Sequence, residues 1–311
     1  MRFRNAHIPT AEAWAVIVSL TVSIVLLLIK FAAYFVTGSA AIFSDAVESI
    51  ANVLGATMAF YALVVAHSPA DEEHPYGHGK IEFLSAMFEG GMVLMAAIFI
   101  VVRTFDAMWR GDLVQEQRLG VGLAMVVLAL FVNGGVGFYL LRTGRKQDSM
   151  TLEADGKHLL SDALTSIAVL VGLGLVKLTG WVYFDPITAL LLGVNIGWMA
   201  LGLIRRSGGR LMDRQDMEDM QLLTEILERH VGPEGKEPRI CAYHKLRHRH
   251  TGRFHWVDFH IQVPATWTIE HAHEVAGAIE GEMERALGDA NATAHIEPYP
   301  DRDCPWCQPE H

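Results

Sequence analysis

The chain has 311 residues, of which 51% are hydrophobic and 19% are charged, so it is more apolar and less charged than an ordinary soluble domain. Its formal net charge is -10, and no stretch combines basic residues with interleaved aromatic residues. These two features exclude a nucleic-acid partner. The three cysteines are too few, and odd in number, to predict a disulfide framework, which indicates that the soluble part faces a reducing compartment.

The apolar residues are concentrated in the first two thirds of the chain, in runs of the about 20 residues that a helix needs to cross a bilayer. We predict six transmembrane helices, at residues 13–36, 40–66, 83–109, 119–141, 159–178 and 182–204. The fifth is expected to continue upstream as a polar helical end through Asp155. The predicted domains are an N-terminal segment 1–12, a membrane domain 13–206, a soluble domain 207–300 and a tail 301–311.

The basic residues in the short connections predict the orientation, because such residues are retained on the cytoplasmic side. They gather before the first helix and after the second, fourth and sixth, at Arg2, Arg4, Lys80, Arg142, Arg145, Lys146, Arg205, Arg206 and Arg210. Arg110 and Arg118 weaken this bias. We expect both termini to be cytoplasmic, in an integral protein of a bacterial inner membrane.

The soluble segment shows the periodicities of a small α+β domain. Residues 217–230 and 268–287 have helical spacing, residues 239–263 are typical of a hairpin that turns at Thr251 and Gly252, and residues 291–298 fit a closing strand. The expected order is αββαβ, with two helices packed on one face of the sheet.

Two of the predicted transmembrane helices carry a polar stripe with the spacing i, i+3, i+7. The stripes are Asp45, Glu48 and Asn52 in one helix, and Asp155, His158 and Asp162 in the other. A charge at the bilayer centre costs roughly 2.5 to 3.5 kcal/mol, so such groups need a partner. The stripes also lie in similar octapeptides, "SDAVESIA" and "SDALTSIA", as in transporters whose paired helices build a central site.

A divalent cation fits as that partner. His158 and Asp162 lie one helical turn apart, and Glu48 and Asn52 can face them from the other helix, which gives the four ligands that zinc favours. The alternative is that these side chains form hydrogen bonds between helices and bind no metal.

The sequence resembles the cation diffusion facilitator family over nearly its whole length. The residues that carry the resemblance are "SDAVESIAN", "HPYGHGKIE", "HLLSD" and the spacing of the tail histidines. The resemblance implies six transmembrane helices, a cytoplasmic metallochaperone-like domain of ferredoxin-like fold, and a homodimer in the lipid bilayer. It also implies a secondary transporter, not an enzyme, that exchanges a transition-metal ion for a proton and needs no organic cofactor.

The resemblance places the transport site on Glu48, Asn52, His158 and Asp162, with Asp45 and Asp155 in support. The family's usual pair in the second helix is His or Asp followed by Asp, whereas this chain has Glu followed by Asn. Oxygen donors favour harder ions, so Mn²⁺, Fe²⁺ or Co²⁺ stands beside Zn²⁺ as the expected substrate.

The resemblance also implies metal sites outside the membrane. Asp71, His74 and His78 match an interfacial site after the second helix, although this stretch can equally be a solvated loop. A set of tail residues matches a binuclear site at the dimer interface, namely His244, His260, His273, His295 and Glu297. Lys80 and Asp213 match a salt bridge between the two domains, or are surface charges of little energetic weight.

Two tail motifs stay outside these sites. The "HRH" run at residues 248–250 is expected to be solvated at the hairpin tip. The "CPWC" motif, with Cys304 and Cys307, is open to three interpretations: a thiolate clip for zinc or copper, a redox pair, or a disordered tail.

The functional hypothesis is export of Zn²⁺ from the cytoplasm in exchange for protons, which compete with metal for the same lone pairs. A membrane-embedded metallohydrolase is disfavoured because the chain has no HExxH helix. A membrane-anchored metal sensor is the remaining alternative, although six helices with intramembrane acids exceed what an anchor requires.

Overall fold

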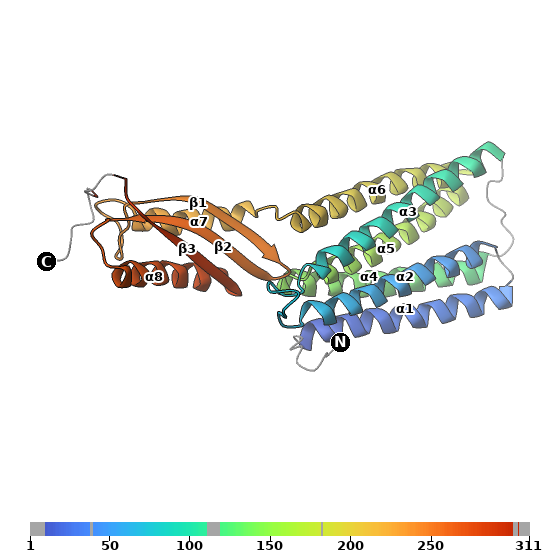
Figure 1. Ribbon diagram of the computed structural model, residues 1–311. Coiled ribbons are helices and arrows are strands. Elements are labelled where there is room, and N and C mark those ends of the chain that lie inside the picture. The colour runs from blue at the N-terminus through green and yellow to red at the C-terminus, as the bar shows by residue number, and fades with distance from the viewer. Residues whose placement is uncertain (1–9, 38–39, 111–118, 182, 301–303, 305–311) are drawn as a thin grey trace. The chain divides into compact units, whose positions relative to one another are not determined.

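The computed structural model describes residues 10–37, 40–110, 119–181, 183–300 and 304 (Figure 1). The chain divides into two compact units, Met1–Gly208 and Gly209–His311. We call them the helical unit and the sheet unit, and each is described by itself.

The helical unit consists of long helices of 27 to 30 residues. At about 1.5 Å per residue, each exceeds the roughly 30 Å hydrocarbon core of a bilayer. They are α1 (Thr10–Thr37), α2 (Ala40–Ala66), α3 (Ile81–Arg110), α4 (Leu119–Gln147), α5 (Met150–Thr179) and α6 (Phe184–Leu211). Each contains most or all of a predicted span, and α5 continues upstream past Asp155 as expected.

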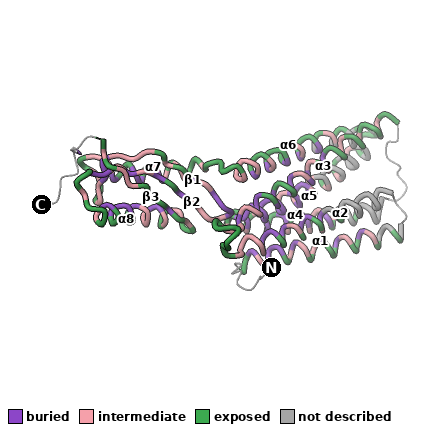
Figure 2. The backbone as a smooth tube through the Cα atoms, viewed as in Figure 1, coloured by how far each residue is buried: buried purple, intermediate pink, exposed green. Residues whose placement is uncertain are grey.

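The apolar character of these helices matches their length. Among the described residues, Thr10–Ala32, Ile81–Arg110 and Val127–Gln147 are long and apolar enough to cross a membrane, and Asn52–Ala66 is a shorter apolar helix. Large apolar side chains lie on the outside, such as Trp109, which is 91% exposed, while polar groups such as Asn52 and Glu89 are buried. Figure 2 shows the buried segments where the helices face one another. This arrangement is the reverse of a soluble bundle and fits a lipid environment.

Close approach of α4 and α5 sets the position of the polar stripe on α5. A Cβ at Gly156 of α5 would lie 2.6 Å from the backbone nitrogen of Leu141 in α4. Only glycine fits such a contact, and small residues of this kind let membrane helices pack backbone to backbone. His158 follows Gly156 by two residues, so this contact helps to fix its depth and direction.

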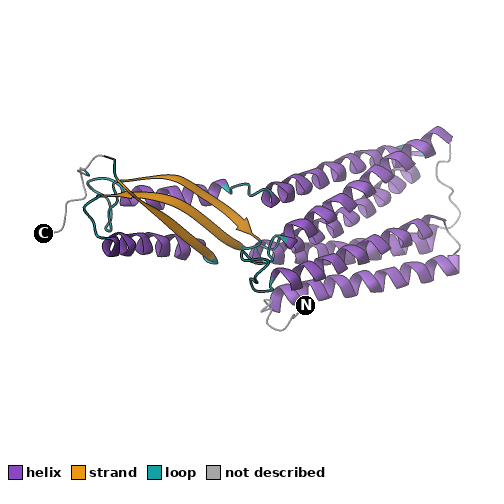
Figure 3. Ribbon diagram, in the orientation of Figure 1, coloured by secondary structure: helices purple, strands orange, loops and turns teal. Residues whose placement is uncertain are grey.

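The sheet unit has the predicted αββαβ order (Figure 3). Its elements are α7 (Met217–His230), β1 (Ala242–Thr251), β2 (Phe254–Val263), α8 (Ile269–Leu287) and β3 (Ala290–Pro298). The strand order is β1-β2-β3, with β1 and β2 antiparallel and β2 and β3 parallel. The hairpin turns at Thr251 and Gly252 as expected, and Thr251 pairs with Phe254 across it.

The core of this unit lies between the two helices and one face of the sheet. Leu223 of α7 and Ile279 of α8 pack with Val257, Phe259 and Ile261 of β2 in one buried cluster. Because side chains alternate along a strand, the odd-numbered residues of β2 face the helices and the even-numbered residues face away from them. The sheet therefore offers a helix-covered face and an open face for polar side chains.

The cysteines depart from the expectation that the chain has no disulfide. Cys241 and Cys304 are disulfide-bonded, with Cα atoms 5.8 Å apart. Cys241 is held beside β2 by a hydrogen bond from its backbone N–H to the carbonyl of Gln262, and after β3 the N–H of Tyr299 donates to Val263. This pairing depends on the sheet and not on sequence spacing. Cys304 is therefore not a free thiolate here, and Cys307 lies outside the described residues.

Candidate metal centres

A buried polar cluster joins α2 and α5 inside the helical unit. The Nδ2 amide of Asn52 donates to Oδ2 of Asp162 at 2.7 Å, and Nε2 of His158 donates to Oδ1 of Asn52 at 2.7 Å. The same His158 nitrogen lies 3.9 Å from Asp162 Oδ2. One imidazole, one amide and one carboxylate thus converge. Their convergence follows from the one-turn spacing on α5 and from the position of Asn52 on the facing helix.

Two further predicted residues lie on the same stretch of α2. Asp45 and Glu48 belong to the helix Ala40–Ala66, but their side chains are outside the described residues. Three of the four predicted ligands of the transport site are therefore brought together in the described structure, and the place of the fourth stays a prediction.

Asp155 lies one turn before His158 and is buried. Its Oδ2 accepts a hydrogen bond of 2.6 Å from the hydroxyl of Ser19 in α1. This hydrogen bond joins α1 to α5 one helical turn before His158. A buried carboxylate held in this way fits the supporting role that the resemblance implies.

Glu89 of α3 is a further acid of this cluster that the sequence reasoning missed. It is 0% exposed, and its Oε2 lies 3.7 Å from Nδ1 of His158. Among the described residues neither of its oxygens has a hydrogen-bond partner. Gly55 of α2 makes room for it, because a Cβ at Gly55 would overlap Oε1. An acid in the middle of an apolar span was the available signal, but a single acid forms no stripe.

The loop between α2 and α3 brings its three predicted residues together. Oδ1 of Asp71 accepts a hydrogen bond of 2.6 Å from the His74 backbone and lies 3.1 Å from His74 Nδ1. His78 Nε2 lies 3.4 Å from the other oxygen, Oδ2. The backbone hydrogen bond from His74, together with the neighbouring imidazoles, lowers the pKa of Asp71, so the carboxylate stays ionised at neutral pH. One carboxylate and two imidazoles thus form a set of three potential metal ligands.

The predicted salt bridge between Lys80 and Asp213 would join the two units and stays a prediction. Within the sheet unit, a carboxylate oxygen of Asp213 lies 3.6 Å from Arg249 Nη1.

The open face of the sheet carries the second set of predicted ligands. Register pairs His244 with His260 and His260 with His295, so three imidazoles form one row across the strands. Glu297 lies beside the row, with Oε1 2.8 Å from His260 Nδ1 and Oε2 3.2 Å from His244 Nε2. The hydrogen bond from His260 is the main reason why the pKa of Glu297 is lowered. His295 is more distant, with Nε2 3.8 Å from Glu297 Oε1.

His273 does not join this set within one chain. It is exposed on α8, which covers the opposite face of the sheet. Any contribution from His273 to the open-face site would have to come from a second copy of the chain.

The "HRH" run is not solvated, which corrects the expectation for residues 248–250. His248 and His250 are 2% and 3% exposed, and they lie with His255 and Asp219 in a fourfold cluster of potential ligands. The reason is that α7 covers the end of the hairpin, which spacing alone does not show. Burial lowers the pKa of His248, and lowers that of His250 to about 3, so both imidazoles are neutral at physiological pH.

Comparison with known proteins identifies the family. Residues 16–212 match the model of the cation efflux transmembrane domain, and residues 235–299 match that of the cation efflux protein cytoplasmic domain. The chain is 34% identical over 283 residues to an uncharacterized transporter of Synechocystis sp., covering 91% of this chain and 88% of the relative. It is 28% identical to the cation-efflux pump FieF of Shewanella oneidensis over 280 residues, and 28% identical to that of Klebsiella pneumoniae over 286 residues. These matches cover 90% and 91% of this chain and 92% of each pump.

The chain belongs to the cation diffusion facilitator family.

Membership confirms the resemblance seen in the sequence and the expected fold, a polytopic helical membrane domain followed by a cytoplasmic α+β domain. The protein is a cation efflux transporter and an integral membrane protein. The sheet unit is its cytoplasmic domain.

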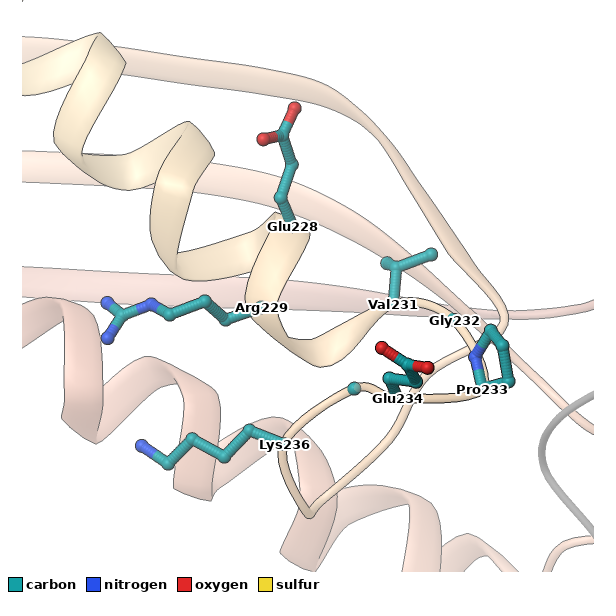
Figure 4. A pocket seen from close by; sticks show the side chains of 8 residues that line it. Glu228, Arg229, Val231, Gly232, Pro233, Glu234 and Lys236 are labelled. Carbon is teal, nitrogen blue, oxygen red and sulfur yellow. The ribbon is translucent and has the colours of Figure 1, made fainter.

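A surface depression of this cytoplasmic domain lies at the end of α7 (Figure 4). It is lined by Glu228, Arg229, Val231, Gly232, Pro233, Glu234, Gly235 and Lys236. Arg229 and Lys236 both pair with Glu282 of α8, at 3.3 Å and 2.7 Å. None of the three clusters of potential metal ligands found among the described residues includes a residue of this depression. We therefore assign it to the packing of α7 on α8.

Proposed function

We propose that this protein exports Zn²⁺ from the cytoplasm in exchange for protons, with Glu48, Asn52, His158 and Asp162 as the transport site. The single observation that carries the proposal is the buried contact of Asn52, His158 and Asp162 between two membrane helices. Polar groups at this depth are costly unless they serve a function or pair with one another. The atoms that a metal would need, Asp162 Oδ2, His158 Nε2 and Asn52 Oδ1, all take part in these hydrogen bonds.

We propose that metal and proton compete for this site. Two hydrogen bonds of 2.7 Å each link the three side chains: Asn52 Nδ2 donates to Asp162 Oδ2, and His158 Nε2 donates to Asn52 Oδ1. An ion that binds there replaces the Nε2 proton of His158 by a metal bond. Protonation restores the hydrogen bond and releases the ion, and this competition couples the two fluxes.

The charge of the cluster favours a dication. Asp162 contributes one carboxylate, Glu48 is the expected second one, and Glu89 stands 3.7 Å from the opposite nitrogen of His158. In our proposal, Glu89 orients His158 from its Nδ1 side when metal is bound, and it takes up a proton when the metal leaves. Asp155 holds the first part of α5 against α1 through its hydrogen bond from Ser19.

The substrate is Zn²⁺ in this proposal because one imidazole and carboxylates in a small site suit zinc. Mn²⁺, Fe²⁺ or Co²⁺ is the second candidate, and the observation that favours it is the amide of Asn52, an oxygen donor placed between the other two ligands. Flux competition among these ions, in the wild type and in Asn52→Asp, separates the candidates.

The functional unit in this proposal is a homodimer whose two termini are cytoplasmic, in an inner membrane. The exposed position of His273 supports the dimer, because His273 could join the open-face set of His244, His260, His295 and Glu297 only from a second copy of the chain. Zinc at this interface and at Asp71, His74 and His78 would link cytosolic metal level to the population of the transporting state.

The experiment is zinc uptake into sealed proteoliposomes under an imposed pH gradient. His158→Ala and Asp162→Ala are expected to reduce uptake to the level of empty liposomes. Ile167→Ala is the matched control, since Ile167 is an exposed residue of the same helix. Wild-type rates in both site variants would refute the assignment, and a wild type that binds zinc without any flux would support the membrane-anchored sensor instead.

A further inference from the structure

The cytoplasmic domain holds a second cluster of histidines, separate from the open-face set. His248 and His250 lie on β1, His255 lies on β2, and Asp219 lies in the first turn of α7. His250 pairs with His255 and His248 pairs with Val257 across the ladder. Residues that pair across two strands share a face, so the three imidazoles lie on the helix-covered face. The open-face set occupies the other face, further along the hairpin.

The distances in this cluster centre on one oxygen. Oδ2 of Asp219 lies 3.2 Å from Nε2 of His250, 3.7 Å from Nε2 of His248 and 3.7 Å from Nδ1 of His255. His248 Nε2 and His255 Nδ1 are 3.1 Å apart. All four ligand atoms lie within 4.8 Å of one another.

These separations are those of a tetrahedral metal site. Zinc binds nitrogen and oxygen at about 2.0 to 2.1 Å, which places tetrahedral ligands about 3.3 Å apart. The four short separations lie on either side of that value, from 3.1 to 3.7 Å. Four of the six separations between the ligand atoms are therefore already close to those of a tetrahedral site.

Apart from the hydrogen bond between His248 and His255, the buried imidazoles of this cluster lack the partners that buried histidines usually have. Three ring nitrogens have no hydrogen-bond partner among the described residues: Nδ1 and Nε2 of His250, and Nδ1 of His248. His250 approaches Asp219 at ion-pair distance only, without hydrogen-bond geometry. Buried polar atoms without partners are uncommon and point to an ion or a water. A metal would be the partner of His250 Nε2.

The charges around the cluster tolerate a dication. Asp219 supplies one negative charge directly, and Asp216, the N-cap residue of α7, supplies a second nearby. Arg210 is the neighbouring cation, and its Nη2 lies 3.7 Å from Asp216 Oδ2. The arginine is thus offset by an acid that is not itself a ligand, which leaves the charge of Asp219 for the ion.

We propose that Asp219, His248, His250 and His255 form a buried zinc site that fastens the start of α7 to the β1–β2 hairpin. Asp219 lies eight residues after the end of α6, and the pair of Asp213 and Arg249 joins the intervening segment to β1. Within the cytoplasmic domain, the ion holds the first turn of α7 on the hairpin. This role does not depend on the transport site.

The test uses the full-length protein in detergent, in a background variant that removes the other candidate sites: His158→Ala, His74→Ala and His260→Ala. The metal-free protein is loaded with Zn²⁺, passed through a desalting column and analysed for zinc per chain. We expect one tightly bound ion per chain. Loading with Co²⁺ instead is expected to give the intense visible absorption of a tetrahedral site.

Two variants of the cluster and one control decide the result. In the same background, His250→Ala is expected to lose the ion, and Asp219→Ala is expected to lower zinc affinity at least about tenfold and to remove the tetrahedral cobalt spectrum. His271→Ala is the control, because His271 is a partly exposed histidine of α8 in the same domain.

The Asp219→Ala variant is expected to fold, since Asp219 is partly exposed and its replacement leaves no cavity in the core. If His250→Ala fails to fold, Asp219→Ala alone decides. A background protein that retains no zinc, or an Asp219→Ala protein with unchanged zinc affinity and cobalt spectrum, would overturn the proposal.

Discussion

Gly55 offers a test of the buried cluster that touches none of its ligands. A Cβ at this position of α2 would overlap Oε1 of Glu89, and would lie 2.9 Å from Cε of Met92 and 3.1 Å from Cδ of Glu89. Because ordinary van der Waals contact begins near 3.4 Å, the carboxylate in Gly55→Ala must retreat. The displacement needed is about 1 Å, a shift that can cost on the order of a hundredfold in rate when it misplaces a reacting group.

The fold is expected to tolerate this change. Alanine is about 1 kcal/mol more favourable than glycine inside a helix, which offsets much of an overpacking cost of about 1 to 3 kcal/mol. Glu89 lies 3.7 Å from His158, so its displacement reaches the transport site directly. We expect Gly55→Ala to keep its thermal stability within a few degrees and to lose zinc flux by about tenfold to a hundredfold.

Zinc flux in proteoliposomes measures the effect, with Gly91→Ala as the matched control. Gly91 lies on α3 two residues after Glu89, and a Cβ there would meet nothing within 4 Å. The two variants add the same methyl group to membrane helices, and only one of them disturbs Glu89. Equal flux in Gly55→Ala and Gly91→Ala would refute the role given to the Glu89 carboxylate.

Three other predictions concern selectivity, helix packing and acid stability. Asn52→Asp adds a carboxylate at the centre of the transport site and is expected to change the relative rates for Zn²⁺ and Mn²⁺ in competition flux; unchanged relative rates would contradict the argument from ligand type. Gly156→Ala forces α4 and α5 apart and is expected to cost about 1 to 3 kcal/mol of stability, seen as a lower melting temperature, while Gly135→Ala, with open space around its Cβ, is expected not to. The pKa of Glu282 is lowered chiefly by its hydrogen bond with Lys236, so the folded state binds fewer protons than the unfolded state near pH 4.5, and stability falls as pH drops through that region. Glu282→Gln is expected to flatten this decline by less than about 1 kcal/mol, since its partners Lys236 and Arg229 are themselves exposed to solvent, whereas Glu274→Gln, at an exposed residue of the same helix, should leave the decline as it is.

The parts of the fold that follow from periodicity were predictable from the sequence. The apolar run at Ala40–Ala66 became α2 with the expected bounds, and the turn at Thr251 and Gly252 closes the hairpin. Local clusters were predictable too, because Asp71, His74 and His78 lie within one short loop and reach one another without any long-range packing.

The missed features depend on which elements pack together. Glu89 is a lone acid in an apolar helix, and its nearness to His158 follows from how α3 packs against α5. His248 and His250 alternate along a strand and therefore share a face, but only the helix α7 above them makes that face buried. The disulfide of Cys241 and Cys304 joins residues 63 apart in the chain, which the sheet brings together.

The most direct test of the account is the simultaneous measurement of zinc and proton flux in proteoliposomes that contain the wild type or His158→Ala. With zinc on one side of the membrane and no pH gradient at the start, the wild type is expected to move zinc inward and protons outward at rates in a fixed ratio. In His158→Ala both fluxes should fall to the level of protein-free liposomes. Zinc movement without proton movement in the wild type, or coupled movement in His158→Ala, would contradict the proposal that metal and proton compete for this buried site.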